Sequence, residues 1–233
     1  MSHLYYLVGP PGAGKRTVGL ALSARTGAAL LDNHLFNDPI FRAYGADGVS
    51  PLPDELFELA EVVRQAGLAA LRLAPRHLSY GFRKVPQRVT ELFRPEGAGK
   101  TADFRELEEH PALFRMLRKW TESVSHILTN HLSGEERGHE VVAQLRALAA
   151  ERGVVFVPVW LACPQPELEA RMGRPERTER LKLRDPELLR ALLERGGTLA
   201  PPPDALVLNT AELHPDEAAR RIVHFARSGH QEA

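Results

Sequence analysis

The sequence predicts an α/β fold, in which a five-stranded parallel sheet is covered by helices on both faces. Strand-like and helical segments alternate along most of the chain, as they do in repeated strand–helix–strand units. The predicted strands are short, continuous apolar runs, which are typical of strands buried on both faces. The strongest of them, "VVFVPVWLAC" at 154–163, is β-branched and almost uninterrupted, so we expect it to be a central strand.

The first part of the chain follows a strand–loop–helix–strand order. The apolar run His3–Val8 stops at a glycine-rich loop and predicts a buried strand. Apolar residues at helical spacing predict a helix over Lys15–Arg25, and a second apolar run predicts a strand over Ala28–Asp32. We expect a loop rich in Gly and Pro next, followed by a long amphipathic helix over Pro53–Ala74.

The rest of the chain contains one irregular segment and then returns to the alternating order. Between residues 76 and 119 apolar residues are scattered among prolines and no strand is predicted, so this segment reads as an insertion into a single domain of residues 1–233. The remaining predictions are strands at 123–130, 154–163 and 204–210 and helices at 135–152, 164–172, 186–194 and 214–226.

The composition predicts a soluble protein whose positive and negative charges balance. Lys and Arg total 30, as do Asp and Glu, so no net charge draws the chain to nucleic acid or to a membrane. Aromatic residues make up 6% of the chain, which argues mildly against a groove that stacks bases. The single cysteine, Cys163, excludes an internal disulfide. Because we find neither a basic leader nor a long apolar run, we expect a cytoplasmic protein.

The chain contains two imperfect copies of a phosphate-binding loop, whose pattern is two glycines separated by four residues, then Lys, then Ser or Thr. The first copy, "GPPGAGKRT" at 9–17, has both glycines and Lys15 but places Arg16 where the hydroxyl residue is expected. The second copy, "EGAGKT" at 96–101, has the correct ending but lacks the first glycine.

Only the first copy has the setting that such a loop needs. A strand must lead the glycines into a tight turn, and a helix must begin there so that its positive end faces the phosphates. The segment 9–17 lies between a predicted strand and a predicted helix, whereas 96–101 has no strand before it and follows Pro95. We therefore predict that the first copy binds phosphate, that the second is a surface loop, and that Thr17 is the hydroxyl nearest to a bound metal ion.

The segment "GPPGAGKRTVGLALSARTGAALLD" resembles the opening of the P-loop small-molecule and nucleotide kinases, in particular the shikimate kinase and adenylate kinase types. In the adenylate kinase type, too, a residue without a hydroxyl group follows the Lys and precedes a Thr. The resemblance extends to "VVFVPVWLACPQPELEARM" and "DALVLNTAELHPDEAARRIVHFA". It implies the three-layer sandwich of P-loop NTPases, with a lid and an inserted helical segment.

The resemblance also implies an enzyme that moves the γ-phosphoryl group of ATP to a small-molecule acceptor with the help of Mg²⁺. The nucleotide phosphates would be held by the loop residues Gly9, Pro10, Gly12, Ala13, Gly14, Lys15, Arg16 and Thr17. Asp32 stands where the shikimate kinase type has the first Asp of a D-x-D motif, which orders magnesium and acceptor, and His34 replaces the second Asp. Thr17 and Asp32 are thus the expected metal ligands, and Asp32 or His34 would orient the acceptor hydroxyl. The missing second carboxylate argues against shikimate itself.

A basic stretch at 171–184 is expected to form the lid. In the related kinases such a stretch follows the helix after the fourth strand and closes over the phosphates. Its six cations are Arg171, Arg174, Arg177, Arg180, Lys182 and Arg184. We favour Arg171 and Arg177 as catalytic residues together with Lys15 and Asp32, because the charge spread over a transferring phosphoryl group must be neutralised.

Other interpretations are open on the sequence alone. Asn130 stands where many P-loop proteins have the Walker B carboxylate, which favours a nucleotide-binding regulatory module or a weak NTPase that acts as a partner-dependent switch. A kinase acting on nucleic acid would need a basic, aromatic groove, which the composition disfavours. The basic first half of segment 76–119 would suit an acidic or phosphorylated acceptor, but a homodimer contact or a solvated surface fits equally well.

Overall fold

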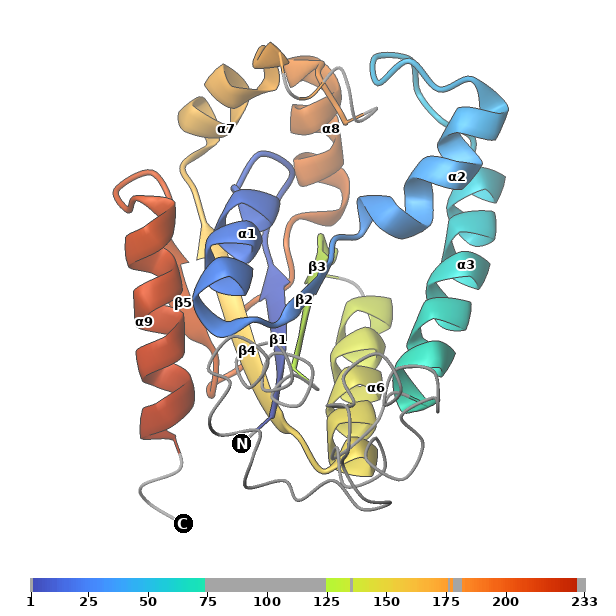
Figure 1. Cartoon of the computed structure of the whole chain (residues 1–233). Coiled ribbons are helices and arrows are strands. Elements are labelled where there is room, and N and C mark those ends of the chain that lie inside the picture. The colour runs from blue at the N-terminus through green and yellow to red at the C-terminus, as the bar shows by residue number, and fades with distance from the viewer. Residues whose placement is uncertain (1, 74–124, 135, 176, 178–181, 230–233) are drawn as a thin grey trace, which may run out of the picture.

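A computed structural model describes residues 2–73, 125–134, 136–175, 177 and 182–229 (Figure 1). The five strands form one parallel sheet in the order β2-β3-β1-β4-β5, which confirms the predicted sheet. The strands are β1 (His3–Val8), β2 (Ala29–Leu31), β3 (His126–Asn130), β4 (Val155–Ala162) and β5 (Leu206–Asn209). The predicted insertion at 76–119, with the second glycine-rich loop, lies outside the described residues.

The register of the sheet aligns the ends of its central strands. Val8, the last residue of β1, pairs with Asn130 of β3 and with Trp160 of β4. In β2, Leu31 pairs with Leu128, so Asp32 follows at the same edge. The segments that leave β1, β2 and β3 therefore start side by side, at the upper edge of the sheet in Figure 1. Crevices for ligands form at this edge in open α/β sheets.

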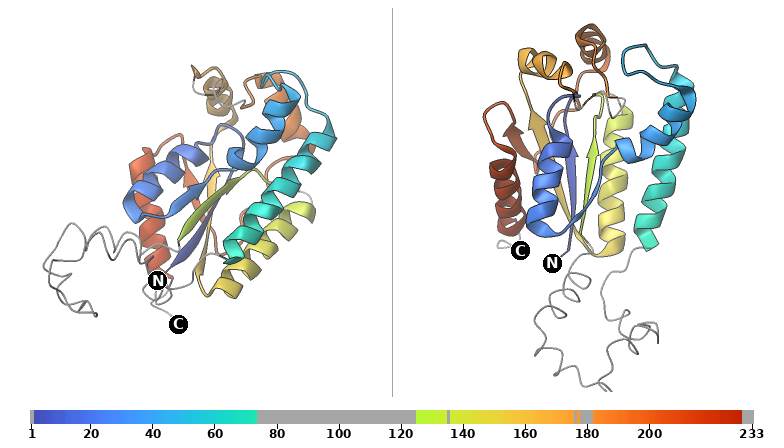
Figure 2. Two further views of the ribbon diagram at one scale, coloured as in Figure 1. Left: turned by 45° about the vertical axis from the view of Figure 1, so that its right-hand side comes forward. Right: turned by 45° about the horizontal axis from the view of Figure 1, so that its top comes forward.

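Helices cover both faces of the sheet and complete the three layers (Figure 2). The described helices are α1 (Lys15–Thr26), α2 (His34–Tyr44), α3 (Asp54–Leu73), α6 (Glu136–Arg152), α7 (Gln165–Met172), α8 (Pro186–Gly196) and α9 (Pro215–Ser228). Leu7 of β1 belongs to the apolar cluster shared with α1, α7, α8 and α9, whereas its neighbour Tyr6 belongs to the cluster shared with α3 and α6. Successive side chains of a strand point to opposite faces, so a continuous apolar strand can support both cores.

Helix α2 corrects the expectation of a Gly- and Pro-rich loop after Asp32. Residues 34–44 are helical although Pro39 lies inside the helix, where it cannot donate a backbone hydrogen bond. Packing compensates for this loss, because Phe41 is 6% exposed and its ring lies 5.8 Å from that of Phe57 on α3, edge to face. The helix also brings Asn33 and Asn37 to the upper edge of the sheet, where they matter for the candidate site below.

The apolar contacts between α1 and α9 allow a prediction about the free energy of unfolding. Ile222 on α9 is fully buried in the cluster that includes Val18 and Leu22 of α1. We expect Ile222→Ala to lower the free energy of unfolding by about 2–5 kcal/mol, because it removes buried methylene groups and leaves a cavity. Val62→Ala, at a position 66% exposed on α3, should change it by less than about 0.5 kcal/mol. Urea titration of both variants checks this, and equal effects would contradict the described core.

Candidate functional site

The loop 9–17 joins β1 to α1 in a turn that requires glycine. Gly12 and Gly14 have φ values of 90° and 80°, in the left-handed region that disfavours side chains. A Cβ on Gly9 would come within 2.5 Å of the Leu161 carbonyl oxygen. Helix α1 begins directly after Gly14, so its positive end and unpaired N–H groups face the loop. An anion is the natural ligand of this arrangement.

Lys15 is the first residue of α1, and its ammonium group turns back onto the loop. Nζ donates hydrogen bonds to the carbonyl oxygens of Gly9 at 2.6 Å and Pro10 at 2.8 Å. The pKa of Lys15 is lowered to about 7, chiefly by burial; Asp32 acts in the opposite direction, and the cations Lys182 and Arg177 contribute to the lowering. The positive groups near this loop therefore repel one another until an anion joins them.

Asp32 follows β2 and lies beside the loop. The residue is 6% exposed, and Oδ1 accepts a hydrogen bond from Thr129 Oγ1 at 2.5 Å. Within the part of the chain that the structure describes, Oδ2 has no hydrogen-bond partner, and Arg16 Nε is 3.8 Å away from it. Arg16, the irregular residue of the loop, thus faces the carboxylate. A buried oxygen with free lone pairs suits a hard cation or a bound water.

His34 begins α2, close to Asp32. Its Nδ1 donates to Asp38 Oδ1 at 3.0 Å, because a carboxylate only accepts. Burial and Lys182 lower the pKa of His34, against the opposing effects of Asp32 and Asp38. The structure therefore brings His34 near Asp32 and Lys182, with a neutral imidazole at pH 7.

Arg171 and Arg177 are held by backbone carbonyl groups. Arg171 Nη1 donates to Gly12 O at 3.2 Å and Nη2 to Thr210 O at 3.0 Å, so this side chain ties α7 and the end of β5 to the loop. Arg177 Nε donates to Leu183 O at 2.8 Å, and burial lowers the pKa of Arg177 to about 10. Residues 176 and 178–181 of the predicted lid, including Arg180, lie outside the described residues.

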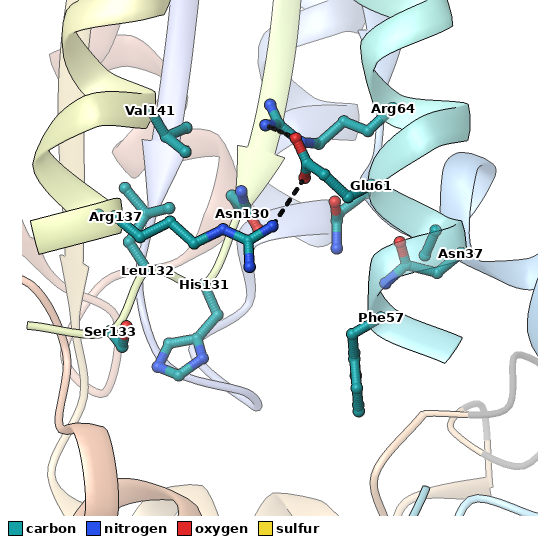
Figure 3. Close-up of a pocket in the computed structure, with 13 residues that line it drawn as sticks. Asn37, Phe57, Glu61, Arg64, Asn130, His131, Leu132, Ser133, Arg137 and Val141 are labelled. Atoms are coloured by element: carbon teal, nitrogen blue, oxygen red, sulfur yellow. Dashed lines mark hydrogen bonds and ion pairs between the residues drawn. The ribbon is translucent and has the colours of Figure 1, made fainter. Parts of the chain in front are cut away.

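A polar pocket of about 190 Å³ opens next to this loop, where α2, α3, the end of β3 and the start of α6 meet (Figure 3). Gly9 N–H donates to the carbonyl oxygen of Asn130 at 3.3 Å, and the Asn130 side chain lines the pocket. The polar residues that line it are Asn33, Asn37, Glu61, Arg64, Asn130, His131, Ser133 and Arg137, and the apolar ones include Phe57 and Val141.

An ion pair forms one wall of the pocket. Arg64 is 8% exposed, and its Nε donates to Glu61 Oε2 at 2.8 Å while Nη2 bonds Oε1. Gln65 also donates to Glu61 Oε1, at 2.7 Å. Burial alone would raise the pKa of Glu61, but these hydrogen bonds outweigh it and hold the pKa below its usual value. Arg137 reaches across from α6, with Nη2 4.0 Å from Glu61 Oε2 (Figure 3).

His131 follows β3 directly and lines the pocket, a role that the sequence alone did not predict. Its Nε2 lies 3.1 Å from Gly197 O and must donate to it, since a carbonyl only accepts. Burial lowers the pKa of His131 to about 4, and Lys15 contributes in the same direction. His131 lies near the loop because it directly follows Asn130, whose carbonyl oxygen accepts the Gly9 N–H at 3.3 Å.

A signal for the ion pair was present in the sequence of α3. Glu61 and Arg64 lie on the same helical stripe as the buried Leu68 and Leu71, at spacings of three and four residues. Charged side chains on a core-facing stripe are unusual unless they are paired. For His131 the signal was its place directly after a predicted strand that ends at the ligand-binding edge.

Comparison with known proteins establishes the fold. No protein-family model and no curated protein matches the chain. A solved structure of a candidate kinase from Chloroflexus aurantiacus matches with a TM-score of 0.55 at 13% identity, over 98% of this chain and 99% of that one. A sugar kinase from Janibacter sp. gives 0.49 at 17% identity over 97% and 95%. A shikimate kinase from Acinetobacter baumannii in complex with shikimate gives 0.40 at 19% identity over 100% and 96%.

The described residues offer neither a preformed metal cluster nor a membrane-spanning helix. Across these ranges, no group of three or more His, Cys, Asp and Glu side chains is placed to hold a metal ion. A cation beside Asp32 would therefore need oxygen ligands from a bound phosphate or from water, which is the usual situation of Mg²⁺. Among the helices described, none is long and apolar enough to cross a bilayer.

Nucleotide binding should draw a proton onto Lys15. In the free protein the pKa is about 7, so the amine is largely neutral at about pH 8. Bound phosphates favour the charged form and raise the pKa, so binding takes up a proton, and affinity should fall by up to about tenfold per pH unit above pH 7. Calorimetry of ADP binding at about pH 8, in buffers of different ionisation enthalpy, measures this uptake. Lys15→Met should abolish it, and a wild-type enthalpy independent of buffer would contradict it.

Proposed function

We propose that the protein is an ATP-dependent phosphotransferase that moves the γ-phosphoryl group of ATP to a hydroxyl group of a small molecule in the pocket of Figure 3. The observation that carries this proposal is the contact of the two sites. The phosphate-binding loop is hydrogen-bonded through Gly9 to Asn130, whose side chain lines the pocket. A terminal phosphate at Lys15 would thus meet a molecule bound among the polar side chains next to it.

The loop supplies what a bound triphosphate requires. Residues 9–17 present N–H groups at the start of α1, and the Lys15 ammonium can exchange its two carbonyl partners for phosphate oxygens. Arg171 donates to the carbonyl oxygen of Gly12 in the loop, and Arg177 donates to that of Leu183. We assign both arginines the stabilisation of charge on the transferring group. Arg16 adds a further positive charge opposite Asp32.

The residues around Asp32 fit a magnesium ion. The unpartnered, buried Oδ2 of Asp32 is a hard oxygen ligand beside the loop, and we assign the ion to Asp32 and Thr17, directly or through water. When bound, Mg²⁺ neutralises charge on the β- and γ-phosphates. Asp32 itself is positioned by Thr129, whose hydroxyl also accepts the Asn33 N–H at 3.0 Å.

Transfer should depend on Lys15 and not on the second glycine-rich loop. We expect wild-type protein to transfer label from γ-labelled ATP to a small molecule in a metabolite extract, and Lys15→Ala to lose about 100-fold or more of that activity, because charge stabilisation of the transferring group is lost. Lys100→Ala is the matched control and should retain it. Lys15-dependent nucleotide binding without transfer would instead support the regulatory switch, and loss of binding in Lys100→Ala alone would reassign the phosphate site.

The role of Asp32 is tested by its dependence on magnesium. Asp32→Asn keeps the hydrogen bond from Thr129 within reach but removes the negative charge, so we expect transfer to fall about 10–100-fold and the Mg²⁺ concentration for half-maximal rate to rise. Asp216→Asn, at an exposed position on α9, should leave both quantities unchanged. An unchanged magnesium dependence in Asp32→Asn would remove Asp32 from the metal site.

A further inference from the structure

The pocket is smaller than those that usually hold drug-sized ligands. Its volume of about 190 Å³ lies below the usual range of roughly 300–1,000 Å³. A compact molecule of monosaccharide size suits such a pocket.

The neutral polar side chains of the pocket can form hydrogen bonds with the hydroxyl groups of a ligand. Asn33, Asn37 and Asn130 each offer a side-chain amide, which has both donors and an acceptor. A hydroxyl group also donates and accepts, so it can bond to either end of an amide. Phe57, 49% exposed, adds an apolar ring at the side of α3. Amides combined with one aromatic face are suited to a molecule with several hydroxyls on a compact carbon skeleton.

The Glu61–Arg64 ion pair in the pocket wall needs no charge from the ligand to balance it. Both oxygens of Glu61 accept hydrogen bonds from Arg64, and Oε1 accepts another from Gln65. Two guanidinium nitrogens of Arg64, Nε and Nη2, donate to this carboxylate. The pair is therefore neutralised internally, whereas Arg137 adds one positive charge to the lining. Selection falls to the amides, to Arg137 and to the acceptor nitrogen of His131.

His131 contributes a hydrogen-bond acceptor of fixed direction. Its Nε2 donates to Gly197 O, so the proton is held on that nitrogen and Nδ1 carries a lone pair. The ring lines the pocket, and its residue directly follows Asn130, whose carbonyl oxygen accepts the Gly9 N–H of the loop at 3.3 Å. Burial lowers the pKa of His131, and the charge of Lys15 contributes in the same direction. His131 is thus a neutral acceptor between the place for the terminal phosphate and the pocket.

We propose that the pocket binds a small polyhydroxylated acceptor and that His131 Nδ1 accepts the hydrogen bond of the hydroxyl group that becomes phosphorylated. This inference rests on the proposed function. The hydroxyl oxygen bonds to the γ-phosphorus, and the bond from that phosphorus to the β–γ bridging oxygen breaks, with ADP taking the electron pair. The hydroxyl proton passes to His131 Nδ1 and from there to solvent. His34 does not line the pocket, and its Nδ1 is engaged with Asp38.

The first test separates the acceptor class from the existence of transfer. Wild-type protein and Lys15→Ala are incubated with γ-labelled ATP, Mg²⁺ and a metabolite extract, and Lys15-dependent products are identified by mass spectrometry. We expect a phosphorylated polyhydroxylated molecule of monosaccharide size. A nucleotide or a macromolecule as the sole product would overturn the inference but leave the proposed function standing. The absence of any Lys15-dependent product would overturn both.

The second test addresses His131 with the identified product. His131→Phe should lower kcat/KM for the acceptor about 10–100-fold, because the hydrogen bond to the reacting group is lost, while the Kd for ATP stays unchanged. His131→Asn retains an acceptor oxygen and should recover part of the loss. His224→Phe, at an exposed site on α9, is the matched control. Equal kcat/KM values for His131→Phe and wild type would overturn the role of His131.

The tautomer offers a readout that does not depend on turnover. Nitrogen-15 NMR of histidine-labelled protein, assigned by the signal missing from His131→Asn, should show Nε2 protonated and Nδ1 unprotonated at neutral pH. The Nδ1 resonance should shift when the identified acceptor is added. A proton on Nδ1, or an Nδ1 signal unaffected by the acceptor, would contradict the proposal even if the variants folded poorly.

Discussion

The hydrogen bond from Gly9 N–H to the Asn130 carbonyl joins the two halves of the candidate site. It continues the ladder between β1 and β3 by one step beyond the pair Val8 and Asn130, into the loop itself. The start of the phosphate-binding loop is therefore fixed relative to the segment after β3, which lines the pocket. Parallel register makes this possible, because both strands deliver their following segments to one edge. A slip of one residue would turn the loop and the pocket residues to the wrong faces of the sheet.

Electrostatics at this edge are unbalanced in the protein alone. Burial weakens the solvation of the Lys15 ammonium and lowers its pKa. The positive charges of Lys182 and Arg177 lower that pKa as well. Asp32 is the opposing charge, yet its Oδ2 bonds to no described group and stands 3.8 Å from Arg16. A polyanion relieves the repulsion among the cations, and a bound cation would satisfy the oxygen. The complex of metal and phosphates that we propose for this site would balance both charges, because the cations and the carboxylate do not fully neutralise each other.

The sequence predicted the strands and the glycine-rich loop, because short local patterns determine both. The apolar runs gave the strands of the sheet, and the spacing of Gly9, Gly14 and Lys15 identified the loop, because tight turns and phosphate contacts need those residues. It missed α2, where the packing of Phe41 on Phe57 overrides the local effect of Pro39. It also missed the pocket. The pocket is built from two distant parts of the chain. Only tertiary packing shows that Glu61 and Arg64 line one cavity with His131 and Arg137.

Two histidines, His34 and His131, lie at this edge of the sheet. They differ in which ring nitrogen is already hydrogen-bonded, and we base their roles on that difference. His34 donates through Nδ1 to Asp38 within its own helix, which positions the first turn of α2 near Asp32. His131 donates through Nε2 to a carbonyl group of the segment after α8, and its free nitrogen belongs to the ring that lines the pocket. A group that receives a hydroxyl proton must be neutral and must face the acceptor, and a pKa of about 4 keeps His131 neutral at physiological pH. Burial lowers the pKa of both Lys15 and His131, and the charge of Lys15 adds to the effect on His131, so the imidazole stays available as an acceptor.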